Sequence, residues 1–143
     1  MARIISGAEI AHEIREQVAV GVKEIKEIGV TPGLVCILVG DNPASVSYVT
    51  NKNKACDEVG IYQETVRLPS ETMEGELVKL VEEYNQDAMF HGILVQLPLP
   101  KHINETEVLR TILPEKDVDG FHPVNIGKLL LGEPDFLPCT AYG

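Results

Sequence analysis

The strongest structural signal in this sequence is the segment GLVCILVGDNPASVSYVTNKNKACDEVGI, residues 33–61. Its first part, residues 33–40, is almost entirely apolar, which is typical of a strand that is buried on both faces of a sheet. The turn-forming residues DNPAS follow at 41–45, and the remainder has the character of a helix that ends at Gly60. A buried strand that leads directly into a helix predicts a sheet of parallel strands covered by helices.

Helices and strands alternate on both sides of this segment. Upstream, apolar residues recur every three or four positions and predict a helix over residues 7–28 with one apolar stripe, formed by Ile10, Ile14, Val18, Val22 and Ile25. Ser6 and Glu9 fit a capping box at the start of this helix. Downstream, the pattern predicts a strand at 62–69 and a third strand that begins the segment 92–100 and is ended by the prolines of that segment. It also predicts helices at 73–84, 104–113 and 124–134. Residues 114–123 are expected to form a loop or a short fourth strand.

The predicted fold is therefore α/β, with three layers, α/β/α, around a parallel sheet, and it resembles the N-terminal domain of amino-acid-dehydrogenase-like proteins. If the strand at 33–40 is central, the strand order reverses between it and the third strand. Ligands of such sheets bind beyond the carboxyl ends of the strands, at the point of reversal. This topology brings Tyr48, Lys52 and Gln96 to a single crevice.

Composition restricts the classes of function. A chain of 143 residues, 44% of them hydrophobic, is long enough for one domain with its own core. It has no apolar run near the roughly 20 residues that a membrane span needs and no signal-peptide pattern, so we expect no membrane partner. The net charge of −10 argues against nucleic acid as a partner. The widely spaced Cys36, Cys56 and Cys139 indicate reduced thiols in the cytoplasm and no metal site.

Tyr48 and Lys52 form the most suggestive pair of polar side chains. They are four residues apart in a predicted helix, so their side chains lie on the same face. A lysine that is shielded from water beside a phenol can accept and donate protons. The alternative is a tyrosine packed on a solvated lysine, which is the more frequent situation for an arbitrary pair at this spacing. Lys54 faces another way, and we interpret it as a solvated charge.

Other polar residues near the predicted crevice allow two interpretations each. Gln96 interrupts an apolar run, so it either bonds to the backbone in the core or orients Lys52 or a ligand. Asp117 and Asp119 occupy alternate positions that would point the same way, with Lys116 close enough to offset their charge and Gly120 allowing a tight turn. These carboxylates either cap a turn or accept paired N–H donors from a heterocycle. By its position, Ser45 is expected to cap the helix.

Four segments together resemble one family: VGDNPASVSYVTNKNKACDEVGI (39–61), GILVQLPLP (92–100), PEKDVDGFHPVNIGKL (114–129) and FLPCT (136–140). In this order, and along the length of the chain, they are similar to the bifunctional methylenetetrahydrofolate dehydrogenase/methenyltetrahydrofolate cyclohydrolase family, commonly called FolD. The resemblance implies a multifunctional enzyme of one-carbon metabolism that serves purine and amino-acid biosynthesis. Its expected reactions are hydrolysis of 5,10-methenyltetrahydrofolate to 10-formyltetrahydrofolate and NADP-dependent oxidation of 5,10-methylenetetrahydrofolate.

The resemblance also implies roles for individual residues. The lysine that matches Lys52 is the central acid/base group of the family, and the tyrosine that matches Tyr48 stacks near the pterin at the reacting site. The glutamine that matches Gln96 orients the lysine. The aspartate that matches Asp119 anchors the amino group and ring nitrogens of the pterin. The remaining pocket positions of the family match Ser45, Leu97 and Pro98.

Domain organisation follows from the same resemblance. It implies that residues 1–137 form the folate-binding catalytic domain and that residues 138–143 form a hinge into an NADP-binding domain that these 143 residues do not include. The sequence accordingly has no G-x-G-x-x-G turn and no P-loop. We expect no NADP on this chain and no dehydrogenase step from it. Whether the chain by itself catalyses the cyclohydrolase step stays open. The family forms homodimers largely through its second domain, which implies a monomer here.

Three other interpretations compete with this one. A short-chain dehydrogenase also uses Tyr-x-x-x-Lys, but it has a glycine-rich turn after its first strand, where this sequence has GDNPAS. A non-catalytic folate-binding module would keep Asp119 and the apolar pocket but show no turnover. A generic α/β domain with a solvated Tyr/Lys face predicts that loss of Lys52 changes neither binding nor activity.

Overall fold

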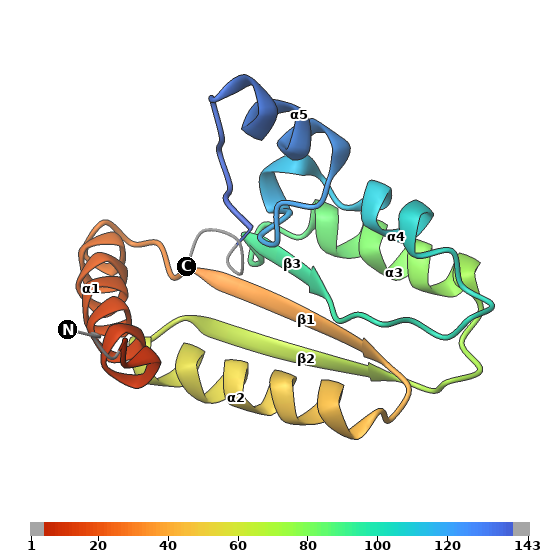
Figure 1. The fold of residues 1–143 in the computed structure, drawn as a ribbon, viewed down its shortest axis with the longest axis horizontal. Coiled ribbons are helices and arrows are strands. Elements are labelled where there is room, and N and C mark those ends of the chain that lie inside the picture. The colour runs from red at the N-terminus through yellow and green to blue at the C-terminus, as the bar shows by residue number, and fades with distance from the viewer. Residues whose placement is uncertain (1–4, 139–143) are drawn as a thin grey trace.

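The computed structural model describes residues 5–138 of the chain, and three parallel strands form its centre (Figure 1). They are β1 (Gly33–Val39), β2 (Tyr62–Leu68) and β3 (Gly92–Val95), in the spatial order β2-β1-β3. In this register, Cys36 of β1 lies opposite Thr65 of β2 and Leu94 of β3. The predicted central position of β1 is confirmed, and with it the reversal of strand order between β1 and β3.

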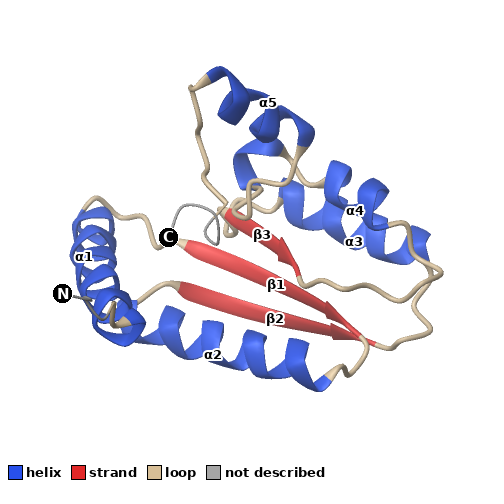
Figure 2. Cartoon of the chain, viewed as in Figure 1, coloured by secondary structure: helices blue, strands red, loops and turns tan. Residues whose placement is uncertain are grey.

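Residues 5–138 also contain five helices (Figure 2). They are α1 (Gly7–Glu27), α2 (Pro43–Val59), α3 (Glu74–Gln86), α4 (Glu105–Thr111) and α5 (Pro123–Leu131), with a single 3₁₀ turn at Pro114–Lys116. Helix α2 lies along β1 and β2 on one face, whereas α3, which packs against α4, lies along β3 on the other face. The predicted three-layer α/β/α arrangement is therefore confirmed.

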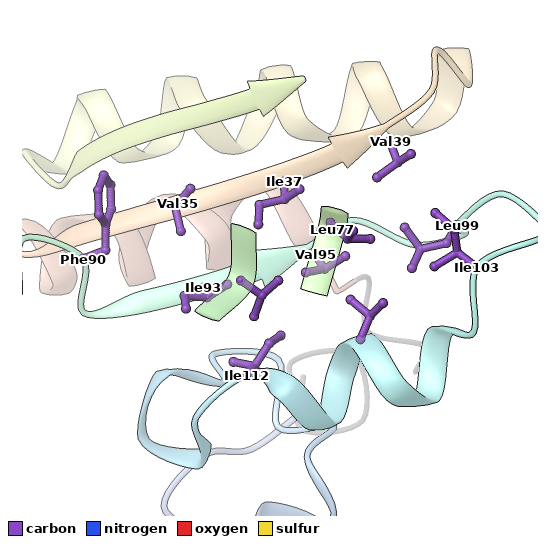
Figure 3. Close-up of a cluster of buried hydrophobic side chains, with 12 residues drawn as sticks. Val35, Ile37, Val39, Leu77, Phe90, Ile93, Val95, Leu99, Ile103 and Ile112 are labelled. Atoms are coloured by element: carbon purple, nitrogen blue, oxygen red, sulfur yellow. The ribbon is translucent and has the colours of Figure 1, made fainter. Parts of the chain in front are cut away.

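The main hydrophobic core fills the space between the sheet and helices α3 and α4 (Figure 3). Val35, Ile37 and Val39 point from β1 into this core, whereas Cys36, between them, packs on the opposite face against Val49 of α2. Both faces of β1 are buried because helices cover both, which explains why its sequence is continuously apolar. The larger cluster consists of Val35, Ile37, Val39, Leu77, Val81, Phe90, Ile93, Val95, Leu99, Ile103, Val108 and Ile112.

Helix α1 is confirmed, but most of its apolar stripe lies on the surface. The side chain of Ser6 accepts a hydrogen bond from the Glu9 amide, as a capping residue should. Val22 is buried, whereas Ile14 is 53% exposed and the stripe residues Ile10, Val18 and Ile25 are also exposed. The helix packs against α2 at the margin of the sheet, so only part of the stripe is covered. No helix within residues 5–138 is both long and apolar enough to cross a lipid bilayer.

The prediction that prolines end the third strand, and that a loop follows residue 114, is confirmed. Strand β3 ends at Val95: the Gln96 amide still bonds to the Ile37 carbonyl at 2.9 Å, and the following prolines, which lack N–H groups, end the ladder. Residues 114–123 add no fourth strand to the part of the sheet that the structure describes. Their contact with the sheet is an isolated parallel bridge between Ile93 and Asp117.

Candidate active site

A pocket of about 160 Å³ lies where β3 ends beside α2. Three segments that are distant in the sequence line it: α2, the end of β3 with the residues that follow, and the loop after the 3₁₀ turn. Their side chains are Tyr48, Lys52, Leu94, Val95, Gln96, Leu97, Asp119 and Phe121. The crevice predicted from the strand order therefore exists, and it contains Tyr48, Lys52 and Gln96 together. Ser45 and Pro98, which are both among the described residues, do not line it.

The start of α2 positions the first two of these side chains. Asn42 is its N-cap, and the Asn42 Oδ1 atom accepts hydrogen bonds from the amides of Ala44 (2.9 Å) and Ser45 (3.3 Å). The expectation that Ser45 caps the helix is wrong, because Ser45 already lies inside the first turn, where its side chain is buried. Gly60 ends the helix with a φ of +83°, a conformation that glycine adopts without strain.

Replacing Asn42 with alanine is expected to lower the free energy of unfolding by about 1 kcal/mol, because two amides of the first turn of α2 lose their acceptor. Chemical denaturation of both proteins measures this difference. Asn51→Ala is the matched control, since Asn51 is an exposed residue in the interior of the same helix. It should change stability by no more than a few tenths of a kcal/mol, toward greater stability. Equal losses in both variants would show that the cap contributes nothing.

Tyr48 and Lys52 lie on the same face of α2, as their spacing predicts. The Lys52 Nζ atom sits 5.1 Å from the centre of the Tyr48 ring, which is a cation–π contact and not a hydrogen bond. Tyr48 is 58% exposed and Lys52 is half-buried, so the tyrosine forms the outer wall and the lysine reaches inward. Lys54 is exposed, as predicted.

Gln96 reaches the pocket from the end of β3. Its Nε2 atom donates a hydrogen bond to the Leu97 carbonyl at 2.8 Å. This bond confirms, for the nitrogen of the side chain, the interpretation that Gln96 bonds to the backbone. Within residues 5–138, no side chain or amide donates to its Oε1 atom, so this oxygen is available to Lys52 or to a ligand.

The two carboxylates of the KDVDG segment have different surroundings. Asp119 lines the pocket, and partial burial raises its pKa, with Asp117 adding to the rise and the positive charge of Lys52 opposing it. Asp117 is 2% exposed and accepts hydrogen bonds from the His122 amide and from Asn125. The expectation that both point the same way is wrong, because this segment is not a regular strand.

Lys116 does not act as the neighbouring counter-charge that the sequence suggested. Its Nζ atom donates to the carbonyls of Tyr84 (2.9 Å) and Asp87 (2.8 Å), at the carboxyl end of α3. A cation at that position interacts favourably with the carbonyls of the helix end. The predicted tight turn at Gly120 is confirmed by its φ of +70°.

Cys36 lies directly under this site. It packs against Leu94, whose side chain also lines the pocket, and burial raises the pKa of its thiol to about 11, with the charge of Lys52 partly opposing the rise. A thiol with a raised pKa forms less of the reactive thiolate at any pH below that value.

We therefore expect Cys36 to resist alkylation. At pH 8 its thiolate fraction is about one hundredth of that of the same cysteine in the unfolded chain, so iodoacetamide should modify it at least about a hundredfold more slowly. Timed alkylation followed by peptide mapping, with and without urea, measures both rates. Equal rates in the two conditions would contradict this account of Cys36.

Sequence reasoning missed three residues of the pocket: Leu94, Val95 and Phe121. The first two were assigned only to a buried strand. Phe121 carried a usable signal, because it stands two positions after Asp119 in an extended segment, where alternate side chains can share a side.

Three of the four histidines form hydrogen bonds with the backbone. The Nδ1 atom of His91 accepts from the Gly33 amide, that of His122 accepts from the Val124 amide at the start of α5, and His102 Nε2 bonds to the Thr72 carbonyl. Across residues 5–138, no group of three His, Cys, Asp or Glu side chains is arranged to hold a metal ion.

Comparison with known proteins identifies similar sequences and similar folds. Residues 5–119 match the family model of the tetrahydrofolate dehydrogenase/cyclohydrolase catalytic domain. The bifunctional protein FolD of Bacillus pumilus is 58% identical over 142 residues, which are 99% of this chain and 50% of the relative. That of Bacillus subtilis is 56% identical with the same coverage. The chain thus spans about half the length of the curated relatives it matches.

Solved structures give the same result for the fold. A 5,10-methylenetetrahydrofolate dehydrogenase from the silkworm Bombyx mori has a TM-score of 0.96 and 43% identity, covering 99% of this chain and 49% of that one. The Trypanosoma brucei methylenetetrahydrofolate dehydrogenase-cyclohydrolase, solved with NADP and an inhibitor, has a TM-score of 0.94 and 36% identity, with the same coverage. Sequence and fold together show that the chain belongs to the tetrahydrofolate dehydrogenase/cyclohydrolase family.

Proposed function

We propose that this chain binds a reduced folate in the pocket beside Lys52 and hydrolyses 5,10-methenyltetrahydrofolate to 10-formyltetrahydrofolate. The observation that carries the proposal is the meeting of one amine and one partly buried carboxylate, Lys52 and Asp119, in a single pocket with apolar walls. Membership of the family supports it, because the relatives are named as bifunctional proteins whose activities include a cyclohydrolase.

The reaction needs a group that both accepts and returns a proton. Water adds to the cationic methenyl carbon that joins N5 and N10, and the adding water loses a proton. The bond from this carbon to N5 then breaks, N5 is protonated, and the carbon remains on N10 as a formyl group. In total, one water is consumed and one proton is released. Lys52 is the pocket residue suited to both transfers, since one amine can serve as base and then as acid.

Two neighbours of Lys52 have supporting roles in this proposal. The Lys52 amine accepts the proton of water and returns a proton to N5. Tyr48 stacks against the ligand from the exposed side, and the Oε1 atom of Gln96 orients the Lys52 amine. Both roles are part of the proposal.

Asp119 supplies the recognition of the pterin in this proposal. A carboxylate that has lost part of its water shell gains most from new charge-assisted hydrogen bonds, and a pterin offers paired N–H donors along one edge. The raised pKa of Asp119 is the mark of that lost hydration. We place Leu97 on the pocket wall beside the ligand, and Ser45 and Pro98 outside direct contact.

The loop between β1 and α2 does not fit the phosphates of a dinucleotide. In nucleotide-binding α/β folds, a glycine-rich turn after the first strand leaves the first amides of the next helix free to bind phosphate. Here the side chain of Asn42 occupies the amides of Ala44 and Ser45. We infer that the NADP-dependent oxidation performed by the family depends on a dinucleotide site other than this loop, and no hydride step is assigned to these residues.

We further propose a cytoplasmic role in one-carbon metabolism that supplies purine and amino-acid biosynthesis. The two cysteines of the described region, Cys36 and Cys56, are free thiols, in agreement with a reducing compartment. The proposed hinge at 138–143 lies almost wholly outside the described residues, which end at residue 138. We propose that full-length members of the family form homodimers and that this chain is a monomer.

Mixing the chain with 5,10-methenyltetrahydrofolate and following the loss of the methenyl absorbance tests this function. We expect hydrolysis faster than the buffer background. A binding titration with a stable folate analogue runs in parallel and reports occupancy independently of turnover. The proposal would be contradicted if the chain showed no binding of the analogue and no hydrolysis above background.

Two observations favour a second candidate, a folate-binding module without turnover. The pocket of about 160 Å³ is smaller than the roughly 300–1,000 Å³ of typical small-molecule sites, and Tyr48 is largely exposed beside it, so the described residues enclose a ligand only in part. Binding without hydrolysis above background would support this candidate over the enzyme.

A further inference from the structure

We propose that Asp117 and Asn125 are positioning residues that hold Asp119 in the pocket. Neither residue lines the pocket. Together with the backbone amide of His122 they form a hydrogen-bonded group, here called the clasp, that closes the turn carrying Asp119 and Phe121. The inference rests on the proposed function only where it concerns ligand binding.

The clasp joins the two ends of one short turn. The Oδ2 atom of Asp117 accepts from the His122 amide at 2.7 Å and from Asn125 Nδ2 at 2.9 Å. The same Asn125 nitrogen donates to the Pro114 carbonyl at 2.9 Å. The residues enclosed by these bonds include Asp119 and Phe121, which both line the pocket, so the clasp sets the direction in which the turn points.

The sheet anchors one end of this turn. The backbone of Asp117 forms the isolated bridge to Ile93 of β3, and Val118 packs with Leu94 in the smaller core cluster. The fit beside Val118 is close, since a Cβ atom at Gly92 would lie 2.5 Å from its Cγ1 atom. Asp119 therefore follows directly after two residues that are fixed to the sheet. The clasp holds the residues that come after the turn, His122 and Asn125, against Asp117.

The clasp has one stable arrangement. Asp117 and Asn125 are each 2% exposed, so water cannot easily replace a lost bond. Turning the Asn125 amide over would place its oxygen against the Pro114 carbonyl and the Asp117 carboxylate, which both need a donor. Within residues 5–138 the Asn125 Oδ1 atom has no hydrogen-bond partner, so the bonds of its nitrogen alone determine its orientation.

Substitutions at Asn125 and at Asp119, alone and together, separate the contribution of the clasp to binding from that of Asp119 itself. Asn125→Ala removes both Nδ2 bonds and touches no pocket residue. If Asn125 acts through Asp119, its loss weakens folate binding only while Asp119 is present. A residue that merely stabilised the fold would weaken binding equally with and without Asp119.

The experiment is a double-mutant cycle on the dissociation constant of a stable folate analogue, with the wild-type chain, Asn125→Ala, Asp119→Ala and the double variant. We expect Asn125→Ala to weaken binding about tenfold in the wild-type background and less than about twofold when Asp119 is already alanine. Equal effects in both backgrounds would overturn the proposal. Asn125→Ser, which removes less of the side chain, replaces Asn125→Ala if that variant does not fold.

Asn85→Ala is the matched control. Asn85 is also a buried asparagine with two hydrogen bonds, to the Thr111 carbonyl and the Leu113 amide, but it leaves the clasp intact. It should lower stability and leave the dissociation constant within about twofold of the wild type. A tenfold loss of binding in this control would also overturn the proposal, because general destabilisation would then explain the result.

A measurement without ligand keeps this test independent of the proposed function. Carboxyl ¹³C NMR follows the titration of Asp119. Burial raises the pKa of this carboxyl, the charge of Lys52 on α2 lowers it, and the charge of Asp117 on the same loop raises it. Loosening of the turn in Asn125→Ala should admit water and lower this pKa, whereas Asn85→Ala should leave it unchanged. An unchanged Asp119 titration in Asn125→Ala overturns the clasp, even if no variant binds folate.

Discussion

Replacing Lys52 with methionine is expected to lower the rate of methenyltetrahydrofolate hydrolysis about 100- to 10,000-fold, the usual contribution of a positioned acid/base group. Methionine keeps most of the length and apolar body of the side chain but can neither accept nor donate a proton. The fold should survive, because the contact of Lys52 with the Tyr48 ring at 5.1 Å contributes only about 0.5–1 kcal/mol at an exposed site. The loss of methenyl absorbance measures the rate.

Lys54→Met is the control for this prediction. Lys54 lies two residues further along α2 and is exposed, so the same substitution there removes a charge without touching the pocket. Its rate should stay within about twofold of the wild type. If both variants lose activity equally, or if Lys52→Met keeps the wild-type rate, Lys52 is not the acid/base group and the interpretation of a solvated Tyr/Lys face stands.

Replacing Asp119 with asparagine is expected to weaken binding of a folate analogue by about 1.5–3 kcal/mol, or about 10- to 150-fold, the cost of losing a charged hydrogen-bond acceptor. Asparagine has nearly the same shape, but its NH₂ group meets the N–H donors of the pterin with another donor. Isothermal titration calorimetry at neutral pH measures the difference. Glu115→Gln, at an exposed position shortly before Asp119, is the control and should bind like the wild type.

The pH dependence of binding gives a second check on Asp119. Its folded-state pKa lies above the ordinary 3.8. In the proposed mode of binding, the ionised carboxylate accepts the N–H donors of the pterin. Binding by the wild type should therefore weaken as the pH falls through that raised pKa, at a higher pH than an ordinary aspartate would produce. Asp119→Asn should lose this acidic limb. The same acidic limb in both proteins would assign it to another group.

The topology followed from the sequence because its signals are local and strong. The apolar run at 33–40 predicted the central strand, and glycine at position 60 predicted the end of α2. The reversal of strand order between β1 and β3 then predicted that Tyr48, Lys52 and Gln96 share one crevice, and all three line the same pocket.

The errors arose where local patterns had more than one solution. Periodicity identified the stripe of α1 but not what covers it, and most of that stripe is exposed. Asn42 and Ser45 are both good capping residues, and only the backbone geometry selected Asn42.

The amino-acid pattern alone thus specified the elements, their order and the helix face that carries Tyr48 and Lys52, because hydrophobic periodicity and caps act within a few residues. Tertiary structure decided which carboxylate enters the pocket. Asp117 and Asp119 are chemically equal and two positions apart, but contacts across the chain separate them. Ile93 binds the backbone of Asp117, and Asn125 binds its carboxylate. These bonds take Asp117 into the interior and leave Asp119 facing Lys52, an outcome that no local pattern contains.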